Sequence, residues 1–346
     1  MIRVAILGAG IGAQHLAAYQ ALPEFDVVLV VDQDANRRQA VAPDVPGAET
    51  IEAALESDAD LIDICLPPHL HAPTAIAALE AGKHVICEKP LATSIGDADT
   101  IAATADKAGR EVFPVFQYRF GPAFTQLQAL IDAGLAGRPH IAALETHWAR
   151  GADYYAVPWR GTWAGEQGGV VLGHAIHAHD LLEHFFAPVT HVTARLTTRI
   201  NPIETEDCAA LTFDLANDAI ATSSITLGAA RDETRLRLVF DRLTTTSGTL
   251  PYTPAEDRWT FTARDPADQV AIDACIAAVP ADPTGFTGFL AEIVKVLSGQ
   301  PNRAVTLADG RRSIELVTAI YAAHRSGGRI SLPLPPTHPM RKGWQP

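Results

Sequence analysis

The sequence predicts an α/β domain built on a doubly wound parallel sheet, followed by an α+β domain with a large, mainly antiparallel open sheet. Over about the first 120 of the 346 residues, apolar strand-like runs alternate with helical segments, which is typical of a parallel sheet. Beyond that point, strand-like runs follow one another without helices, which favours an antiparallel sheet. A chain this long usually forms two domains, and we expect them at residues 1–120 and 121–346.

In the first domain, apolar runs and the residues that end them mark the elements. The first strand, 3–7, ends at a glycine, and the helix that follows stops before Pro23. Two prolines close the strand at 61–68, and a glycine ends the helix at 73–83. The remaining strands are expected at 27–32, 84–90 and 111–117, and a further helix at about 95–109.

The second domain is expected to begin with a helix at 124–134 and a strand at 140–148. A histidine-rich helix, 173–185, comes next, and the chain ends in a long helix at 307–327 and a proline-rich tail. Between these helices, strands are expected at 191–199, 208–215, 219–227, 234–240 and 258–264.

Composition excludes several classes of protein. A formal net charge of −13 argues against nucleic-acid binding, which depends on clustered basic side chains. No signal peptide is visible and no apolar run approaches the length of a bilayer, so we expect a cytoplasmic protein without a membrane partner. The cysteines are far apart and form no CxxC pair, which favours reduced core cysteines over a zinc site; they are Cys65, Cys87, Cys208 and Cys275.

The stretch GAGIGA (8–13) has the context of a dinucleotide-binding turn, because a strand precedes it, a helix follows, and Asp32 lies about 20 residues on. Gly8 permits the tight turn, and Gly10 lets the backbone approach a pyrophosphate. Asp32 would accept hydrogen bonds from the adenosine ribose and repel a 2′-phosphate, so the sequence favours NAD. Arg37 and Arg38 weaken that preference, and NADP remains an alternative.

The stretch HVICEKPLA (84–92) gives the chain a resemblance to a known family. With GAGIGA, the passage HAPTAIAALEAGKHV, the YRF segment at 118–120, a glycine pair before a His–Asp helix and the closing SGGRISLP, it resembles the Gfo/Idh/MocA oxidoreductases. That family includes glucose–fructose oxidoreductase and inositol dehydrogenase. The motifs span essentially the whole chain, and their order and spacing together are specific.

The resemblance implies a Rossmann domain, a nicotinamide cofactor and a carbohydrate-like small-molecule substrate. It also implies a homodimer or homotetramer formed through the C-terminal sheet. The lysine of the EKP turn is Lys89, and the resemblance places it beside the nicotinamide and the reacting carbon. An ammonium there would stabilise negative charge as hydride moves. Further cofactor-binding residues implied are Ile11, Gly12, Pro67, His71 and Glu88.

The resemblance also assigns roles within the histidine-rich helix. His177 and Asp180 match the family pattern, but Gly173 stands where the pattern has an aspartate. We expect His177 to be the catalytic base. On a helical wheel Asp180 and His184 share a sector with His177, and we expect His184 to be a structural partner of Asp180. Imidazole and carboxylate at this spacing also suit a metal, but we expect none.

Several residues are expected to contact the substrate. His174 stands next to the missing aspartate and could replace it, and Trp159 belongs to an aromatic stretch, 147–163, that suits the apolar faces of sugar rings. The resemblance places Tyr118 and Arg119 near the site, with Lys89, His177 and Asp180. Arg119 could instead tie the two domains together.

The sequence therefore predicts an NAD(P)-dependent oxidoreductase that moves a hydride between nicotinamide and a hydroxyl-bearing carbon of a sugar, polyol or sugar derivative. Three alternatives remain open at this point. One is a lyase or glycosidase in which tightly held NAD is reduced and reoxidised within one cycle. Another is a catalytically silent dinucleotide-binding regulator, and the third is a metalloenzyme.

Overall fold

The computed structural model describes residues 1–346 and divides them into two compact units. The first unit contains residues 1–116 and 286–314, and the second contains residues 117–285 and 315–346. This division differs from the two consecutive domains expected at 1–120 and 121–346. The first boundary lies within a few residues of the expected one, but a later segment of the chain returns to the first unit.

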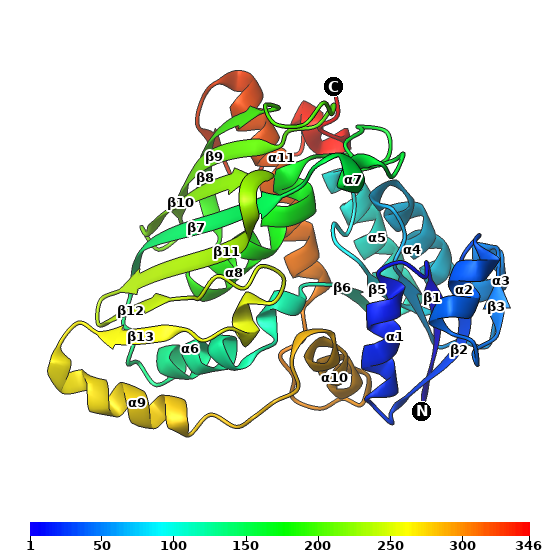
Figure 1. Ribbon diagram of the computed structural model, residues 1–346, viewed down its shortest axis with the longest axis horizontal. Helices are drawn as coiled ribbons and strands as arrows, with labels where there is room; N and C mark the ends of the chain where they lie inside the picture. Colours follow the sequence, from blue (N-terminus) through cyan, green and yellow to red (C-terminus); the bar gives the residue numbers. More distant parts are fainter. The chain divides into compact units, whose positions relative to one another are not determined.

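A six-stranded parallel sheet forms the centre of the first unit, in the order β3-β2-β1-β4-β5-β6 (Figure 1). The strand order reverses between β1 and β4, and the carboxyl ends of strands at such a point form the usual ligand site of this architecture. The strands are β1 (Ile2–Leu7), β2 (Phe25–Val31), β3 (Gly47–Ala48), β4 (Leu61–Ile64), β5 (His84–Cys87) and β6 (Val112–Pro114). The helices are α1 (Gly12–Gln20), α2 (Ala35–Val41), α3 (Ile51–Leu55), α4 (His71–Glu80) and α5 (Ile95–Ala108).

The returning segment belongs to the first unit because its side chains pack and pair there. It includes most of α10 (Gly285–Leu297) and the start of α11 (Leu307–Ser326). The ring of Phe286 lies 4.4 Å from that of His15, centroid to centroid. Arg311 Nε donates to Asp99 Oδ1 at 2.7 Å. Local sequence patterns carry no signal for contacts between residues so far apart in the chain.

The second unit is built on an eight-stranded sheet in the order β13-β12-β11-β7-β10-β9-β8-β14 (Figure 1). Its pairs are antiparallel except β7 with β10, which are parallel. The strands are β7 (Pro139–Ala149), β8 (Val189–Thr197), β9 (Cys208–Leu215), β10 (Ile220–Thr226), β11 (Gly228–Phe240), β12 (Leu243–Thr246), β13 (Thr260–Ala263) and β14 (Ile330–Ser331). Its other helices are α6 (Pro122–Asp132), α7 (Ala152–Tyr155), α8 (Ile176–Phe185) and α9 (Gln269–Ala277).

Helix α8 covers one face of this sheet. His179 Nε2 lies 3.0 Å from Ser223 Oγ on β10, and its ring meets Phe213 of β9 edge-on. The apolar side chains of α8 that were expected to face the core are buried; they are Ala178, Leu181, Leu182 and Phe185. The alternation of buried and exposed residues along β9 and β10 leaves the opposite face of these strands exposed.

Most expected strands and helices are present within a few residues of their expected bounds. The elements that sequence patterns did not predict are β3, β12, β14, α2, α3, α7, α9 and α10. The first six of these have seven residues or fewer, too few to show a clear hydrophobic period. No helix combines the length and apolar character that crossing a bilayer requires.

Candidate active site

The glycine turn after β1 has a tight backbone geometry that suits a dinucleotide site. Gly8 has a φ of +97°, and a Cβ there would lie 2.4 Å from the carbonyl oxygen of Cys65. Only glycine fits that position. A Cβ at Gly10 would meet nothing within 4 Å, so the space beside this backbone is open. Helix α1 lies close to the sheet at Gly12, where an added Cβ would lie 2.9 Å from the side chain of Ile6.

No side chain caps the N-terminus of α1, where Ile11 is the N-cap residue and is exposed. The backbone N–H groups at a helix start carry a partial positive charge and bind phosphate oxygens well. The open space at Gly10 and this uncapped helix start therefore fit a dinucleotide pyrophosphate.

Asp32, which follows β2, is held in place by the same turn. Its Oδ2 accepts from the backbone N–H of Ala9 at 2.9 Å, and its Oδ1 accepts from that of Asp34 at 2.9 Å. Arg37 Nη1 lies 3.2 Å from Oδ2. Burial alone would raise the pKa of Asp32, but these hydrogen bonds and Arg37 outweigh it and lower the pKa. Asp32 is therefore ionised at neutral pH, as binding of a ribose diol requires.

The other expected cofactor residues lie at the carboxyl ends of β4 and β5. Pro67 precedes the short helix Pro68–Leu70, and His71 begins α4. Its Nδ1 lies 2.6 Å from the carbonyl oxygen of Pro90, and burial lowers the pKa of this histidine. Glu88 and Lys89 directly follow β5, and the Lys89–Pro90 peptide bond is cis. The first unit thus gathers these residues at the edge of the sheet that carries the glycine turn.

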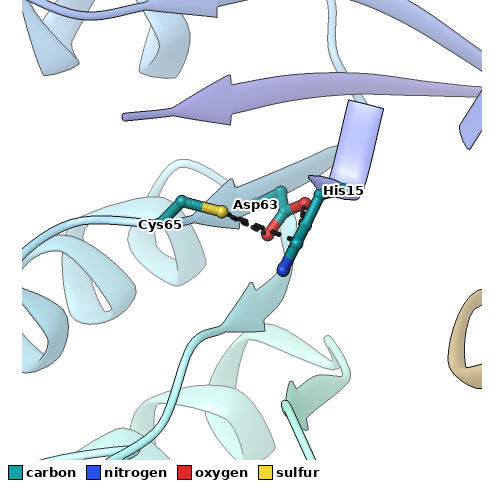
Figure 2. A group of neighbouring side chains, drawn as sticks. All are labelled: His15, Asp63 and Cys65. Carbon is teal, nitrogen blue, oxygen red and sulfur yellow. Dashed lines mark hydrogen bonds and ion pairs between the residues drawn. The ribbon is translucent and has the colours of Figure 1, made fainter. Parts of the chain in front are cut away.

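A buried polar cluster lies beneath the glycine turn, and the sequence reading missed it. Figure 2 shows His15 of α1, Asp63 of β4 and Cys65 directly after that strand, with their side chains converging. His15 Nδ1 lies 2.8 Å from Asp63 Oδ2 and 3.5 Å from Cys65 Sγ. Tyr19 also donates its hydroxyl to Asp63 Oδ2, at 2.9 Å. The signal in the sequence was an aspartate in the middle of the buried strand LIDI, because a buried carboxylate needs partners.

This cluster is a candidate metal site by its donor atoms, because His15, Asp63 and Cys65 place them within 4.8 Å of one another. However, both ring nitrogens of His15 face carboxylates, since Nε2 lies 3.2 Å from Glu88 Oε1. An imidazolium donates from both nitrogens and cannot bind a metal. Burial would lower the pKa of His15, but Asp63 outweighs it and the net pKa is raised well above 6.5. The contacts therefore describe a hydrogen-bonded ion cluster.

In the second unit, two residues expected to position the substrate pair with each other. Arg119 Nε donates to Asp180 Oδ2 at 2.7 Å, and its Nη2 donates to Oδ1 at 2.5 Å. Both side chains are buried, so this bidentate ion pair fixes α8 to the 117–119 turn. His184, which was expected to be a partner of Asp180, is exposed, and its Nε2 lies 3.1 Å from Gln128 Oε1.

His177 is buried on α8 and stacks on Tyr118, with 4.3 Å between ring centroids and 17° between ring planes. Tyr118 is itself anchored, because its hydroxyl donates to the carbonyl oxygen of Pro251 at 2.7 Å. His174 is also buried, and its ring meets Trp148 edge-on at 5.0 Å. Trp159 is only partly buried, which leaves part of its ring available.

A carboxylate does lie beside Gly173, although not from the position that the family pattern predicts. A Cβ at Gly173 would have one neighbour, Glu166 Oε1, at 3.7 Å. Glu166 is 7% exposed, and its Oε2 accepts from the backbone N–H of Gly161 at 2.6 Å. Glu166 comes from the loop before the helix, and the sequence pattern of the helix does not predict it.

A second missed residue, Glu206, holds the start of the histidine-rich helix. Its carboxylate accepts from the backbone N–H of Gly169 at 3.1 Å, from that of Val171 at 3.2 Å, and from the Tyr321 hydroxyl at 2.9 Å. A Cβ at Gly169 would lie 1.9 Å from the carbonyl oxygen of Glu206, which explains the glycine. The first turn after it, Val171–Ala175, is a π-helix, a feature frequent at functional sites. Burial raises the pKa of Glu206 to about 7.

Comparison with known proteins gives matches to both units. Residues 2–116 match a family model described as an oxidoreductase family with an NAD-binding Rossmann fold, and residues 124–245 match the GFO/IDH/MocA C-terminal domain. The chain is 28% identical over 246 residues to an oxidoreductase of Synechocystis sp., covering 65% of each chain. It is 34% identical over 147 residues to inositol 2-dehydrogenase of Mycolicibacterium smegmatis. That match covers 40% of this chain and 43% of the relative, so both curated relatives are matched over less than two thirds of their length.

Among solved structures, the WlbA dehydrogenase of Chromobacterium violaceum in complex with NADH and UDP-GlcNAcA is similar to this chain, with a TM-score of 0.85. The two are 27% identical, and the match covers 96% of each chain. Both family models lie in the expected order, and together they account for more than half of the sequence. The chain therefore belongs to the Gfo/Idh/MocA family of oxidoreductases, with an NAD-binding Rossmann domain at its N-terminus.

Proposed function

We propose that this protein is an NAD-dependent dehydrogenase that oxidises a CH–OH group of a sugar, polyol or sugar derivative. The observation that carries the proposal is the similarity, over 96% of both chains, to a dehydrogenase solved with NADH and UDP-GlcNAcA. The turn at Gly8 and Gly10 and the ionised Asp32 support the choice of cofactor, because they fit a pyrophosphate and a ribose diol.

The reaction separates an alcohol into a carbonyl, a proton and a hydride. When bound, NAD supplies the hydride acceptor. The Lys89 ammonium stabilises the negative charge that develops on the substrate oxygen as the proton leaves. His177 accepts that proton, directly or through water. Stacking on Tyr118 holds the imidazole ring of His177 in one orientation, which a proton acceptor requires.

The other expected substrate residues divide into two groups. Arg119 and Asp180 act on the substrate indirectly, because each uses its charge on the other and thereby fixes the position of α8. Trp159 and His174 are the candidates for direct contact. The carboxylate of Glu166, beside Gly173, would supply the negative charge that the aspartate supplies in the family pattern.

We also propose a cytoplasmic homodimer or homotetramer that assembles through the exposed face of the eight-stranded sheet. Along β9 and β10 the exposed side chains include Ala210, Thr212, Thr222 and Ser224. Small side chains of this kind let two sheet faces approach closely. Sedimentation of the unmodified protein and of Thr222→Arg tests this proposal, because a bulky charge on the face should yield a smaller species.

A panel of sugars, polyols and sugar acids tests the activity. Each compound is offered with NAD or NADP, and the absorbance of the reduced cofactor is followed for the unmodified protein and for Lys89→Ala. We expect reduced NAD to accumulate with at least one compound. We expect Lys89→Ala to bind NAD but not to reduce it. Turnover of a substrate without net reduction of NAD would instead indicate internal reoxidation of the cofactor.

A further inference from the structure

The turn that carries Lys89 is held by the side chain of its neighbour. Glu88 Oε2 accepts from the backbone N–H of Lys89 at 3.0 Å, and Glu88 Oε1 lies 3.2 Å from His15 Nε2. The His15 and Glu88 side chains are almost completely buried, at 1% and 9% exposure. One carboxylate therefore connects α1, which begins at the glycine turn, with the backbone of Lys89.

The other side of the His15 ring is fixed as firmly. Its Nδ1 lies 2.8 Å from Asp63 Oδ2, and Asp63 also accepts from Tyr19 at 2.9 Å and from the Cys65 thiol at 3.6 Å. Asp63 therefore faces three groups that can donate, and Glu88 faces the other ring nitrogen of His15. Only an imidazolium can donate to both carboxylates, one from each ring nitrogen. Burial would lower the pKa of His15, but Asp63 outweighs it, and the raised pKa favours the imidazolium.

We infer that His15 is a positioning residue for Lys89, because as an imidazolium between Asp63 and Glu88 it fixes the Glu88 carboxylate and, through it, the backbone of Lys89. This inference rests on the proposed function, in which Lys89 stabilises charge on the substrate. The inference assigns a role to a residue that lies beneath the glycine turn. The sequence motifs do not connect this residue with Lys89.

The physical reason is the burial of Glu88. A buried carboxylate that loses its cationic partner either takes up a proton or moves toward water, and either change weakens its hydrogen bond to Lys89 N–H. A displacement of a catalytic group by 1 Å can slow the reaction by roughly a hundredfold. The glycine turn does not depend on this contact, because Gly8 is fixed by its own hydrogen bond to the carbonyl of Val31 and by its close approach to Cys65.

The test compares the full-length variants His15→Gln and Glu88→Gln, and the double variant, with His84→Gln as control. His84 lies at the opposite end of β5, where its Nδ1 accepts from the backbone N–H of Glu111 at 3.0 Å. We expect kcat to fall by roughly 10–100-fold in His15→Gln and in Glu88→Gln, a loss typical of replacing a residue that orients a reactive group without touching the substrate. The Kd for NAD, measured by calorimetry, should change much less. The double variant should lose little more than either single variant, because both remove one link.

A second readout does not depend on activity. Hydrogen exchange of the peptide segment containing residues 88–90 should accelerate in His15→Gln and remain unchanged in His84→Gln. A kcat for His15→Gln equal to that of the control, or kcat losses that add in the double variant, would overturn the inference, and so would unchanged exchange at 88–90. If the unmodified protein reduces NAD with no compound, the proposed function fails, and the exchange experiment alone decides whether His15 holds the turn.

Discussion

The buried carboxylate of Glu206 makes a measurable contribution to the pH dependence of stability. Its pKa is raised to about 7 by burial, against an ordinary value of 4.5, although hydrogen bonds from Tyr321, Val171 and Gly169 act in the opposite direction. Between these two pH values the folded protein keeps a proton that the unfolded chain has released. The free energy of unfolding therefore falls as the pH rises from 4.5 to 7, and does not change further above that range.

The size of this effect follows from the two pKa values. At about 1.4 kcal/mol per pH unit, a rise from 4.5 to about 7 corresponds to a loss of about 3 kcal/mol. Glu206→Gln removes the ionisation and should remove the loss. The glutamine side chain has one acceptor oxygen where glutamate has two, so the variant also differs from the unmodified protein in stability at low pH. The test therefore uses only the part of the stability difference that changes with pH.

The assay is urea unfolding between pH 4.5 and 8, followed by tryptophan fluorescence. All five tryptophans lie in the second unit, and Trp344 stacks on Tyr321, the hydrogen-bond partner of Glu206. The stability of Glu206→Gln minus that of the unmodified protein should rise by about 3 kcal/mol across this range. Glu204→Gln, an exposed neighbour, is the control for removal of a charge from the same loop. If the stability difference between Glu206→Gln and the unmodified protein stays constant from pH 4.5 to 7, burial does not raise the pKa of Glu206 in this way.

Three further predictions concern the cofactor, the histidine-rich helix and metals. Asp32→Ala should narrow the preference for NAD over NADP in calorimetry, because the carboxylate that repels a 2′-phosphate is gone; tighter binding of NADP by the unmodified protein would contradict this. His177→Ala should slow turnover by roughly 10²–10⁴-fold, the usual loss for a general base, whereas the exposed His184→Ala on the same helix should not. Dialysis against a chelator should leave activity intact, because the imidazolium of His15 already satisfies both carboxylates; stoichiometric metal at this site, with activity lost on its removal, would show otherwise.

Sequence patterns predicted the parallel sheet of the first unit because its main strands are apolar runs, each ended by a residue that stops a strand. The strands β1, β4 and β5 are almost completely buried, so their composition alone identifies them. The glycine turn and Asp32 could also be predicted, since a positive φ and a close backbone approach demand glycine at fixed spacing. These features depend on residues close together in the chain.

The features that sequence reasoning missed depend on distant residues. Asp180 pairs with Arg119, 61 positions away, so a helical wheel for α8 could not find its partner. His15 meets Glu88 at a separation of 73 residues. The carboxylate beside Gly173 comes from Glu166 in the preceding loop, where no periodic pattern operates. In each case the charged side chains are buried and therefore need partners, but only the structure shows that burial and identifies the partners.

Transfer of a labelled hydride tests whether this protein oxidises its substrate by moving a hydride directly to the nicotinamide. A substrate identified in the panel is prepared with deuterium on the carbon that bears the reacting hydroxyl, and the cofactor is analysed by mass spectrometry after a single turnover. We expect NADH that carries the deuterium from the unmodified protein, and none from Lys89→Ala, although that variant binds NAD. Unlabelled NADH, or a product formed while NAD remains oxidised, would contradict direct hydride transfer to the nicotinamide as the reaction of this protein.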